Sequence, residues 1–383
     1  MKQERVLLIS SFAESVTNFR GPLIEAMRGC GANVDVAAPD VENAPGLKIA
    51  LANLGVGLHN VSLRRNGTNP LSDIRLGFSL FRLMGRLRPT ATFPYTIKPV
   101  IFGTIAAWVA RVPRRYALIT GLGYVFTGTR EGFLTRLVRI LYRFALTKAH
   151  KVFFQNPDDE RLFRELGLMP AAVPSIVVNG SGVDLASFAM SPILKRMPVF
   201  LMIGRLIGDK GLREYAEAAK RVKGIHPEAR FQLIGWLDTN PDAIAQSELD
   251  WWIADGTLEF LGKLDDVRPA IADSTVYVLP SYREGTPRTV LEAMSMGRPI
   301  ITTDAPGCRE TVIDGENGFL VPVKSVDALV EAMLKFIEDP TLAPRMGRRS
   351  REIAEEKYDV HKVNAVMLHE MGITPAPGEE PHA

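Results

Sequence analysis

The chain has 383 residues, of which 46% are hydrophobic and 23% are charged. This composition excludes a disordered or fibrous protein, and the length is sufficient for two domains of about 150–200 residues each. Its two cysteines, Cys30 and Cys308, lie far apart, which excludes a disulfide framework or a cysteine-based metal site and favours a reducing cytoplasm.

No apolar stretch is long enough to cross a bilayer. The longest, residues 99–110, is shorter than the about 20 residues that a spanning helix needs. Residues 1–5 run directly into a predicted strand, without the pattern of a signal peptide. We therefore expect no transmembrane anchor.

The net charge of +3 hides a strong asymmetry. Between Val61 and Lys151 the sequence has sixteen basic residues and only two acidic ones, Asp73 and Glu131. Interleaved with aromatic and aliphatic residues, this charge suits an anionic membrane surface or a diphosphate-bearing acceptor, although a merely solvated surface is the alternative. Nucleic acid is not expected as a partner, because no nucleic-acid-binding motif accompanies the charge.

The first half of the chain alternates apolar runs with helical patterns, as in a Rossmann-like domain. A strand at 5–11, a loop at 12–21 and a helix at 22–28 are predicted to open it. The loop lacks G-x-G-x-x-G, which argues against a dinucleotide there. Further strands are predicted at 33–38, 61–63, 91–95, 116–120, 152–155 and 176–178.

Residues 133–150 predict a basic helix. Its apolar stripe comprises Leu134, Leu137, Leu141, Phe144 and Ala145, and its cations are Arg136, Arg139, Arg143 and Lys148. Such a helix either lies on a membrane surface or packs on the sheet with its arginines exposed, and the two arrangements are partly compatible.

A turn cluster at 179–184 predicts the end of the first domain, 1–184, and a linker at 185–197. The second domain, 198–358, is predicted to contain strands at 198–203, 231–234, 258–260, 276–279, 299–302 and 318–321. We expect a terminal helix at 359–372 and a disordered tail at 373–383.

Two features of the second domain favour an anion site. Arg205 and Lys210 are five residues apart across a glycine-bracketed turn, so that both can converge on one anion, although ordinary surface charge is the alternative. Thr286 is predicted as a helix N-cap, with Pro287 at the first helical position and Gly297 after the last turn. The N–H groups of such a helix start, together with its dipole, bind phosphate.

Two carboxylates accompany this helix start. Glu284 precedes it and Glu292 is expected about two turns in, roughly 9 Å from the start at about 1.5 Å per residue. Carboxylates at both ends of a diphosphate suit the hydroxyls of a ribose and of a sugar. The alternative is that both glutamates are solvated surface residues.

This pattern resembles the signature of the family 4 retaining glycosyltransferases. The resemblance rests on Glu284 and Glu292 with seven residues between them, on Ala293 and Gly297, and on residues 299–301 and 315–320. It implies an α/β protein with the GT-B fold, in which two Rossmann-like domains face a central cleft and the C-terminal helix crosses back to the first domain.

The resemblance also implies roles for individual residues. Glu284 contacts the donor hexose, Glu292 holds the ribose, and Arg205 and Lys210 grip the diphosphate; Arg205, Lys210 and Glu284 are the catalytic candidates. The other donor-binding candidates are Gly204, Leu261, Gly262, Gly285, Thr286, Pro287, Thr289 and Val290. The candidates on the acceptor and diphosphate side are Asn18, Arg20, Gly21, Lys98, Gly121 and Gly123. Arg20 could equally form a salt bridge at a helix start.

The chain departs from the family at residues 120–123, where many members carry a histidine and this sequence has Thr-Gly-Leu-Gly. A histidine-assisted role is therefore not expected. Residues 121–123 and 146–155 resemble bacterial enzymes that add an N-acetylhexosamine to a sugar on undecaprenyl diphosphate. That likeness implies a UDP-sugar donor, a polyprenyl-diphosphate-linked acceptor and a peripheral location at the inner face of the cytoplasmic membrane.

We expect no metal and no cofactor apart from the donor substrate, because the chain has neither an Asp-X-Asp triplet nor a cluster with metal-ligand spacing. Fixed cations and N–H dipoles then meet the charge that develops on the leaving diphosphate. Two alternatives remain open: a GT-B sugar-nucleotide epimerase, and a non-catalytic subunit that binds nucleotide sugars or a membrane.

Overall fold

The computed structural model describes residues 4–63, 70–121, 133–238, 240 and 242–374. The chain forms two compact units. The first comprises Met1–Ser181 and His361–Ala383, and the second comprises Gly182–Val360. Within the described ranges, no helix has both the length and the apolar character needed to span a bilayer.

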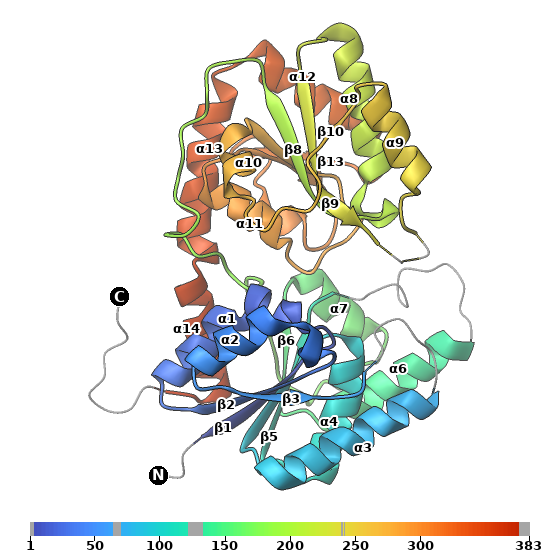
Figure 1. Cartoon of the computed structure of the whole chain (residues 1–383), viewed down its shortest axis with the longest axis vertical. Coiled ribbons are helices and arrows are strands. Elements are labelled where there is room, and N and C mark those ends of the chain that lie inside the picture. The colour runs from blue at the N-terminus through green and yellow to red at the C-terminus, as the bar shows by residue number, and fades with distance from the viewer. Residues whose placement is uncertain (1–3, 64–69, 122–132, 239, 241, 375–383) are drawn as a thin grey trace. The chain divides into compact units, whose positions relative to one another are not determined.

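The first unit is built on a seven-stranded parallel sheet in the order β3-β2-β1-β4-β5-β6-β7 (Figure 1). The strands are β1 (Arg5–Ile9), β2 (Asn33–Ala38), β3 (Gly57–Asn60), β4 (Ala91–Pro94), β5 (Arg114–Ile119), β6 (Lys151–Phe154) and β7 (Ser175–Val177). β1 is apolar and buried from Val6 to Ile9, since helices cover both of its faces.

The helices of this unit are α1 (Glu14–Gly29), α2 (Pro45–Asn53), α3 (Pro70–Leu87), α4 (Thr104–Val109), α6 (Phe133–Leu146), α7 (Pro157–Glu165) and α14 (Val360–Met371), with short turns η1 (Val41–Asn43) and η2 (Pro99–Gly103). Successive side chains of β1 point to opposite faces of the sheet and therefore contact different helices. Val6 and Leu8 share a core with α1, α2 and α14, whereas Leu7 and Ile9 share one with α3 and α4.

The C-terminal helix α14 therefore belongs to the core of the first unit, as expected. Met371 illustrates the attachment: its carbonyl accepts hydrogen bonds from the Tyr116 hydroxyl at 2.8 Å and from Arg114 Nη1 at 3.1 Å.

The second unit has a six-stranded parallel sheet in the order β10-β9-β8-β11-β12-β13. Its strands are β8 (Val199–Leu206), β9 (Arg230–Leu237), β10 (Glu259–Phe260), β11 (Val276–Leu279), β12 (Ile300–Thr303) and β13 (Gly318–Val321). Its helices are α8 (Leu212–Ile225), α9 (Gln246–Ala254), α10 (Arg268–Asp273), α11 (Arg288–Ser295), α12 (Val326–Glu338) and α13 (Leu342–Ile353), with turns η3 (Gly208–Lys210), η4 (Arg309–Thr311) and η5 (Ala354–Tyr358).

Both sheets have the strand order of doubly wound nucleotide-binding folds, which runs outward in both directions from the first strand. The expectation of two Rossmann-like domains is confirmed. In such sheets ligands bind beyond the carboxyl ends of the strands where the order reverses. In the second unit this point lies between β8 and β11.

Two local predictions are wrong, and one helix was not predicted. α1 begins at Glu14 rather than at 22, so most of the predicted loop 12–21 is helical. The buried face of α1 includes Arg20. A cation at this position interrupts the helical spacing of apolar residues, so the sequence does not show where the helix begins. The third strand lies at Gly57–Asn60 rather than at 61–63, and α3 is absent from the elements expected from the sequence.

The segment expected to be a linker, 185–197, packs on the core of the second unit through Leu185, Phe188 and Ile193. Arg298 is fully buried and holds this segment: its guanidinium donates to the carbonyls of Ser191 at 2.8 Å and Ile271 at 2.9 Å. Burial lowers the pKa of Arg298 to about 10.

Candidate active site

The cationic turn follows β8 directly. Arg205 lies near the end of the strand, where its Nη1 donates to Asp238 Oδ2 at 3.0 Å. Lys210 ends the short turn η3, and Gly211 then has a φ of +72°. A Cβ at Gly211 would lie 2.1 Å from the carbonyl oxygen of Pro280, so only glycine lets the turn approach the loop after β11.

The loop after β11 is hydrogen-bonded to this turn. The Tyr282 N–H and the Ser281 hydroxyl both donate to the carbonyl of Asp209, at 2.9 and 3.2 Å. These bonds bring Lys210 to Glu284, and the two side chains form an ion pair. Two of the three predicted catalytic residues, 74 positions apart, are thus in contact at the point where the strand order reverses.

The Glu284 loop rests on the segment after β12. Its backbone N–H donates to the carbonyl of Pro306 at 2.9 Å. Gly307 has a φ of +81°, and a Cβ there would lie 2.2 Å from the carbonyl oxygen of Glu284. Gly307 therefore fixes the position of the Glu284 backbone.

We expect Gly307→Ala to lower catalytic activity by roughly 100-fold, because the added methyl group displaces the Glu284 loop from the position needed for reaction. Gly315→Ala is the matched control: its φ of +79° imposes similar backbone strain, but no atom lies within 4 Å of its Cβ. Steady-state kinetics of both variants provide the measurement, and equal losses would show that backbone strain alone is responsible.

α11 begins one residue later than predicted. Pro287 is the N-cap, with an extended backbone, and Arg288 is the first helical residue, because the carbonyl of Pro287 already accepts from the N–H groups of Val290 and Leu291. The prediction of Thr286 as the N-cap is therefore wrong. Gly297, with a φ of +77°, ends the helix as predicted.

Glu292 lies one turn into α11, about 6 Å of helical rise from Arg288, rather than two turns. It is only 7% exposed, and Arg288 Nε donates to its Oε1 at 2.8 Å. Burial raises the pKa of Glu292, although the neighbouring arginine opposes this effect. The alternative that Glu292 is a solvated surface residue is therefore excluded.

The remaining donor-side candidates lie around the same strand ends. Gly204 is on β8 opposite Gly235 of β9. The carbonyl of Gly262 accepts from the Gly235 N–H at 3.0 Å, which holds the Leu261–Gly262 loop beside β9. Gly285, Thr286 and Pro287 connect Glu284 to α11, and Thr289 and Val290 lie in its first turn.

Two residues that the sequence did not single out support this site. Asp238 positions Arg205, and the Tyr277 hydroxyl donates to Thr289 Oγ1 at 2.6 Å. An acidic residue just after β9 could have been noticed as a partner for Arg205, because β8 and β9 are adjacent. Tyr277 lies inside an apolar strand and gives no sequence signal.

The first-unit candidates are less closely grouped. Asn18, Arg20 and Gly21 lie on α1 rather than in a loop. Arg20 is 2% exposed, and its guanidinium lies over the Tyr95 ring at 5.4 Å. Lys98 pairs with Asp73 at 2.8 Å. Gly121 follows β5 with a φ of +125°, and Gly123 lies outside the described residues.

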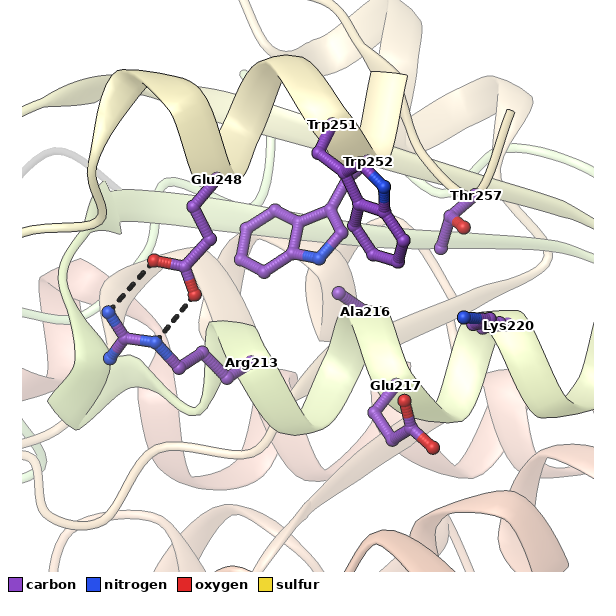
Figure 2. Close-up of a pocket in the computed structure, with 8 residues that line it drawn as sticks. All are labelled: Arg213, Ala216, Glu217, Lys220, Glu248, Trp251, Trp252 and Thr257. Carbon is purple, nitrogen blue, oxygen red and sulfur yellow. Dashed lines mark hydrogen bonds and ion pairs between the residues drawn. The ribbon is translucent and has the colours of Figure 1, made fainter. Parts of the chain in front are cut away.

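A separate hollow of about 280 Å³ lies between α8 and α9 (Figure 2). Arg213 and Glu248 form a doubly hydrogen-bonded pair at one end, and Lys220 Nζ lies 4.9 Å from the Trp251 ring centroid. Trp252 packs into the core, whereas Trp251 is half exposed. None of the predicted site residues lines this hollow.

Across the described ranges, the His, Cys, Asp and Glu side chains form no group of three or more that could hold a metal ion. The site instead pairs each predicted diphosphate-binding cation with a carboxylate. Such an arrangement can bind a ligand that carries both phosphate and hydroxyl groups, because the cations suit the former and the carboxylates the latter.

Comparison with known proteins gives matches over both units. The family model described as glycosyl transferases group 1 matches residues 197–339, and the glycosyl transferase 4-like domain matches residues 17–180. The chain is 27% identical over 370 residues to N,N'-diacetylbacillosaminyl-diphospho-undecaprenol alpha-1,3-N-acetylgalactosaminyltransferase of Campylobacter jejuni, covering 93% of this chain and 95% of that protein.

It is 28% identical over 290 residues to the UDP-Gal:alpha-D-GlcNAc-diphosphoundecaprenol alpha-1,3-galactosyltransferase of Escherichia coli, covering 71% and 72% of the two chains. Among solved structures, sucrose-phosphate synthase from Thermosynechococcus elongatus aligns with a TM-score of 0.79 at 18% identity, covering 96% of this chain and 98% of that one.

Anabaena HepE in complex with UDP and glucose aligns with a TM-score of 0.78, also at 18% identity, covering 97% and 100% of the two chains. The two family matches, the two doubly wound sheets and the ion pairs of Arg205 with Asp238 and of Lys210 with Glu284 support the same assignment. The chain is a glycosyltransferase with the GT-B fold and belongs to the family of group 1 glycosyl transferases.

Proposed function

We propose that this enzyme transfers a hexose or N-acetylhexosamine from a nucleotide diphosphate sugar, with UDP as the nucleotide, to a saccharide carried on polyprenyl diphosphate. The observation that carries the proposal is the contact between Lys210 and Glu284, with Arg205 nearby on β8, at the strand ends where such sheets bind ligands. The acceptor is proposed from the printed names of the two bacterial relatives, and UDP from one of them.

In this proposal Arg205 and Lys210 bind the donor diphosphate, Glu284 the hexose and Glu292 the ribose. The backbone of Gly204, residues 285–287, Thr289 and Val290 surrounds the phosphates, and the Leu261–Gly262 backbone contacts the base. We assign to the acceptor the candidates on the first unit, namely Asn18, Arg20, Gly21, Lys98, Gly121 and Gly123.

The proposed reaction needs no metal and retains the anomeric configuration. The C1–O bond to the diphosphate breaks, while an acceptor hydroxyl forms the new C1–O bond on the same face. The leaving phosphate oxygen takes the hydroxyl proton, so no enzyme nucleophile is required. Arg205 and Lys210 stabilise the developing charge on the diphosphate as preorganised cations.

Binding is tested by thermal shift with UDP-, GDP- and ADP-sugars, because a ligand of the native state raises the melting temperature according to its affinity. We expect UDP-sugars to give the largest shift. The same shift in EDTA would support metal independence of binding, and no shift with any nucleotide sugar would refute the donor assignment.

Turnover is tested by donor consumption with and without a polyprenyl-diphosphate-linked acceptor. A transferase consumes donor only with the acceptor, and NMR of the product reports the anomeric configuration. An epimerase would release an altered sugar nucleotide without acceptor, and a binding subunit would consume nothing. A polyprenyl-linked acceptor resides in the membrane, so we propose that the enzyme works peripherally at the inner face of the cytoplasmic membrane.

A further inference from the structure

α3 is apolar on two opposite faces. Leu76 and Leu80 are fully buried against the sheet of the first unit. Leu71, Ile74 and Phe78 lie on the other side at i, i+3 and i+7, and Ile74 and Phe78 are 65% and 60% exposed. A surface helix normally has one apolar face, whereas α3 carries this second apolar stripe exposed on its other side.

α6 repeats the same arrangement. Tyr142 and Leu146 are buried, whereas Leu137, Ile140 and Phe144 again lie at i, i+3 and i+7 and are exposed, with Ile140 at 64%. Of the two arrangements left open for this helix, packing of the whole predicted stripe on the sheet does not hold, because Leu137 and Phe144 are exposed. The helix packs on the sheet through one face and presents a second apolar stripe to solvent.

α4 packs against both α3 and α6, and Trp108 near its end lies beside the α6 stripe. The Trp108 ring meets the Phe144 ring edge-on, with centroids 5.8 Å apart. Lys148 Nζ lies 4.8 Å from the Trp108 ring centroid and 5.1 Å from that of Phe144. A lysine beside two exposed rings can keep its ammonium group in water while the rings enter an apolar phase.

Cations flank both stripes. Arg75 and Arg82 are exposed beside the α3 stripe, and Arg136 and Arg143 are exposed beside the α6 stripe. The only acidic residue in the sequences of α3, α4 and α6 is Asp73, which is paired with Lys98. The surface therefore combines exposed apolar side chains with a positive charge that its own helices do not neutralise.

We propose that the second stripes of α3 and α6, together with Trp108 of α4, insert into the surface of an anionic lipid bilayer. This bilayer face is defined by Leu71, Ile74, Phe78, Trp108, Leu137, Ile140 and Phe144. Apolar side chains bind among the acyl chains, and the flanking arginines bind anionic headgroups. A second copy of the chain fits less well, because two such faces would bring their arginines together.

The inference rests on the proposed function in one respect, namely that the polyprenyl-linked acceptor lies in a membrane to which the enzyme must bind. Its test needs neither donor nor acceptor: the full-length protein is sedimented with phosphatidylcholine vesicles, with or without phosphatidylglycerol. We expect binding to the anionic vesicles that salt weakens, and little binding to the zwitterionic ones. Equal binding to both, or binding to neither, overturns the proposal.

The variant Ile74→Ser/Ile140→Ser is expected to lower the vesicle partition coefficient by about tenfold or more, because two large side chains no longer leave water. Ile225→Ser, at a 61% exposed isoleucine on α8, is the matched control and should bind like the wild type. Arg75→Glu/Arg82→Glu should reduce binding by a similar factor, whereas Lys195→Glu, at an exposed lysine of the second unit, should leave it unchanged.

Unaltered melting temperatures show that the variants fold, as expected for exposed positions. If the double serine variant binds vesicles like the wild type, the face is not the bilayer contact. A dimer in light scattering that this variant dissociates also overturns the proposal and assigns the face to a second copy. Vesicle binding without sugar transfer refutes the proposed function alone, and transfer without vesicle binding refutes the bilayer face alone.

Discussion

Lys210→Ala is expected to lower kcat for sugar transfer by about 100-fold or more, the usual effect of removing one preorganised group that stabilises transition-state charge. The Lys210 ammonium already lies against Glu284. It is therefore held near the proposed position of the diphosphate, where negative charge grows as the C1–O bond breaks. Arg205→Ala should give a loss of similar size, because Asp238 holds its guanidinium at the end of β8.

The matched control is Arg213→Ala. Arg213 lies on α8, three residues beyond Lys210, and pairs with Glu248 instead of a site carboxylate. We expect its kcat to stay near that of the wild type. Steady-state kinetics with saturating donor make the comparison, and a loss below about tenfold for Lys210→Ala, worth ~1.4 kcal/mol of barrier, would remove Lys210 from the assigned role.

Glu292→Gln is expected to have opposite effects on stability and on donor affinity. Burial raises the pKa of Glu292 in the folded state, so the folded protein binds a proton there more tightly than the unfolded chain. The free energy of unfolding therefore falls as pH rises from the unfolded pKa through the raised folded pKa. Glutamine lacks this titration, so the variant should gain stability over the wild type as pH rises to neutral.

The same substitution should weaken UDP-sugar binding by about tenfold or more, because hydrogen bonds from ribose to a charged carboxylate become bonds to a neutral amide. Thermal melts across pH, with and without donor, measure both effects. Glu217→Gln is the control, since Glu217 forms an i,i+4 pair with Arg221 on an exposed face. If Glu292→Gln binds donor as tightly as the wild type, Glu292 does not hold the ribose.

Much of the fold could be predicted because parallel strands buried on both faces are short continuous apolar runs. β2, β11 and β13 lie at the predicted residues, and most other strands are shifted by one to three. The failures have physical causes. Arg20 occupies a core position of α1, which removes the apolar period that would have placed the helix start. α3 carries apolar side chains on opposite faces, so no single stripe marks it as a helix.

The site was predicted in part. The spacing of Arg205 and Lys210 and the helix signals around Glu284 lie within single segments, and those are visible in a sequence. The contact between Lys210 and Glu284 depends on two adjacent strands and on glycines at 211 and 307 that let loops approach. The support of Arg205 by Asp238 likewise depends on the pairing of β8 with β9, which local patterns do not reveal.

The pairing of Arg205 with Asp238 and of Lys210 with Glu284 leaves the centre of the site nearly neutral. A simple anion must compete with Asp238 and Glu284 for Arg205 and Lys210, and it has no hydrogen-bond donors for these carboxylates. A sugar nucleotide also displaces the carboxylates from the cations, but its hydroxyl groups can donate hydrogen bonds to them. Inorganic pyrophosphate should consequently be a poor competitor of the donor in a displacement assay, and the enzyme can discriminate against the abundant small phosphates of a cell without a lid.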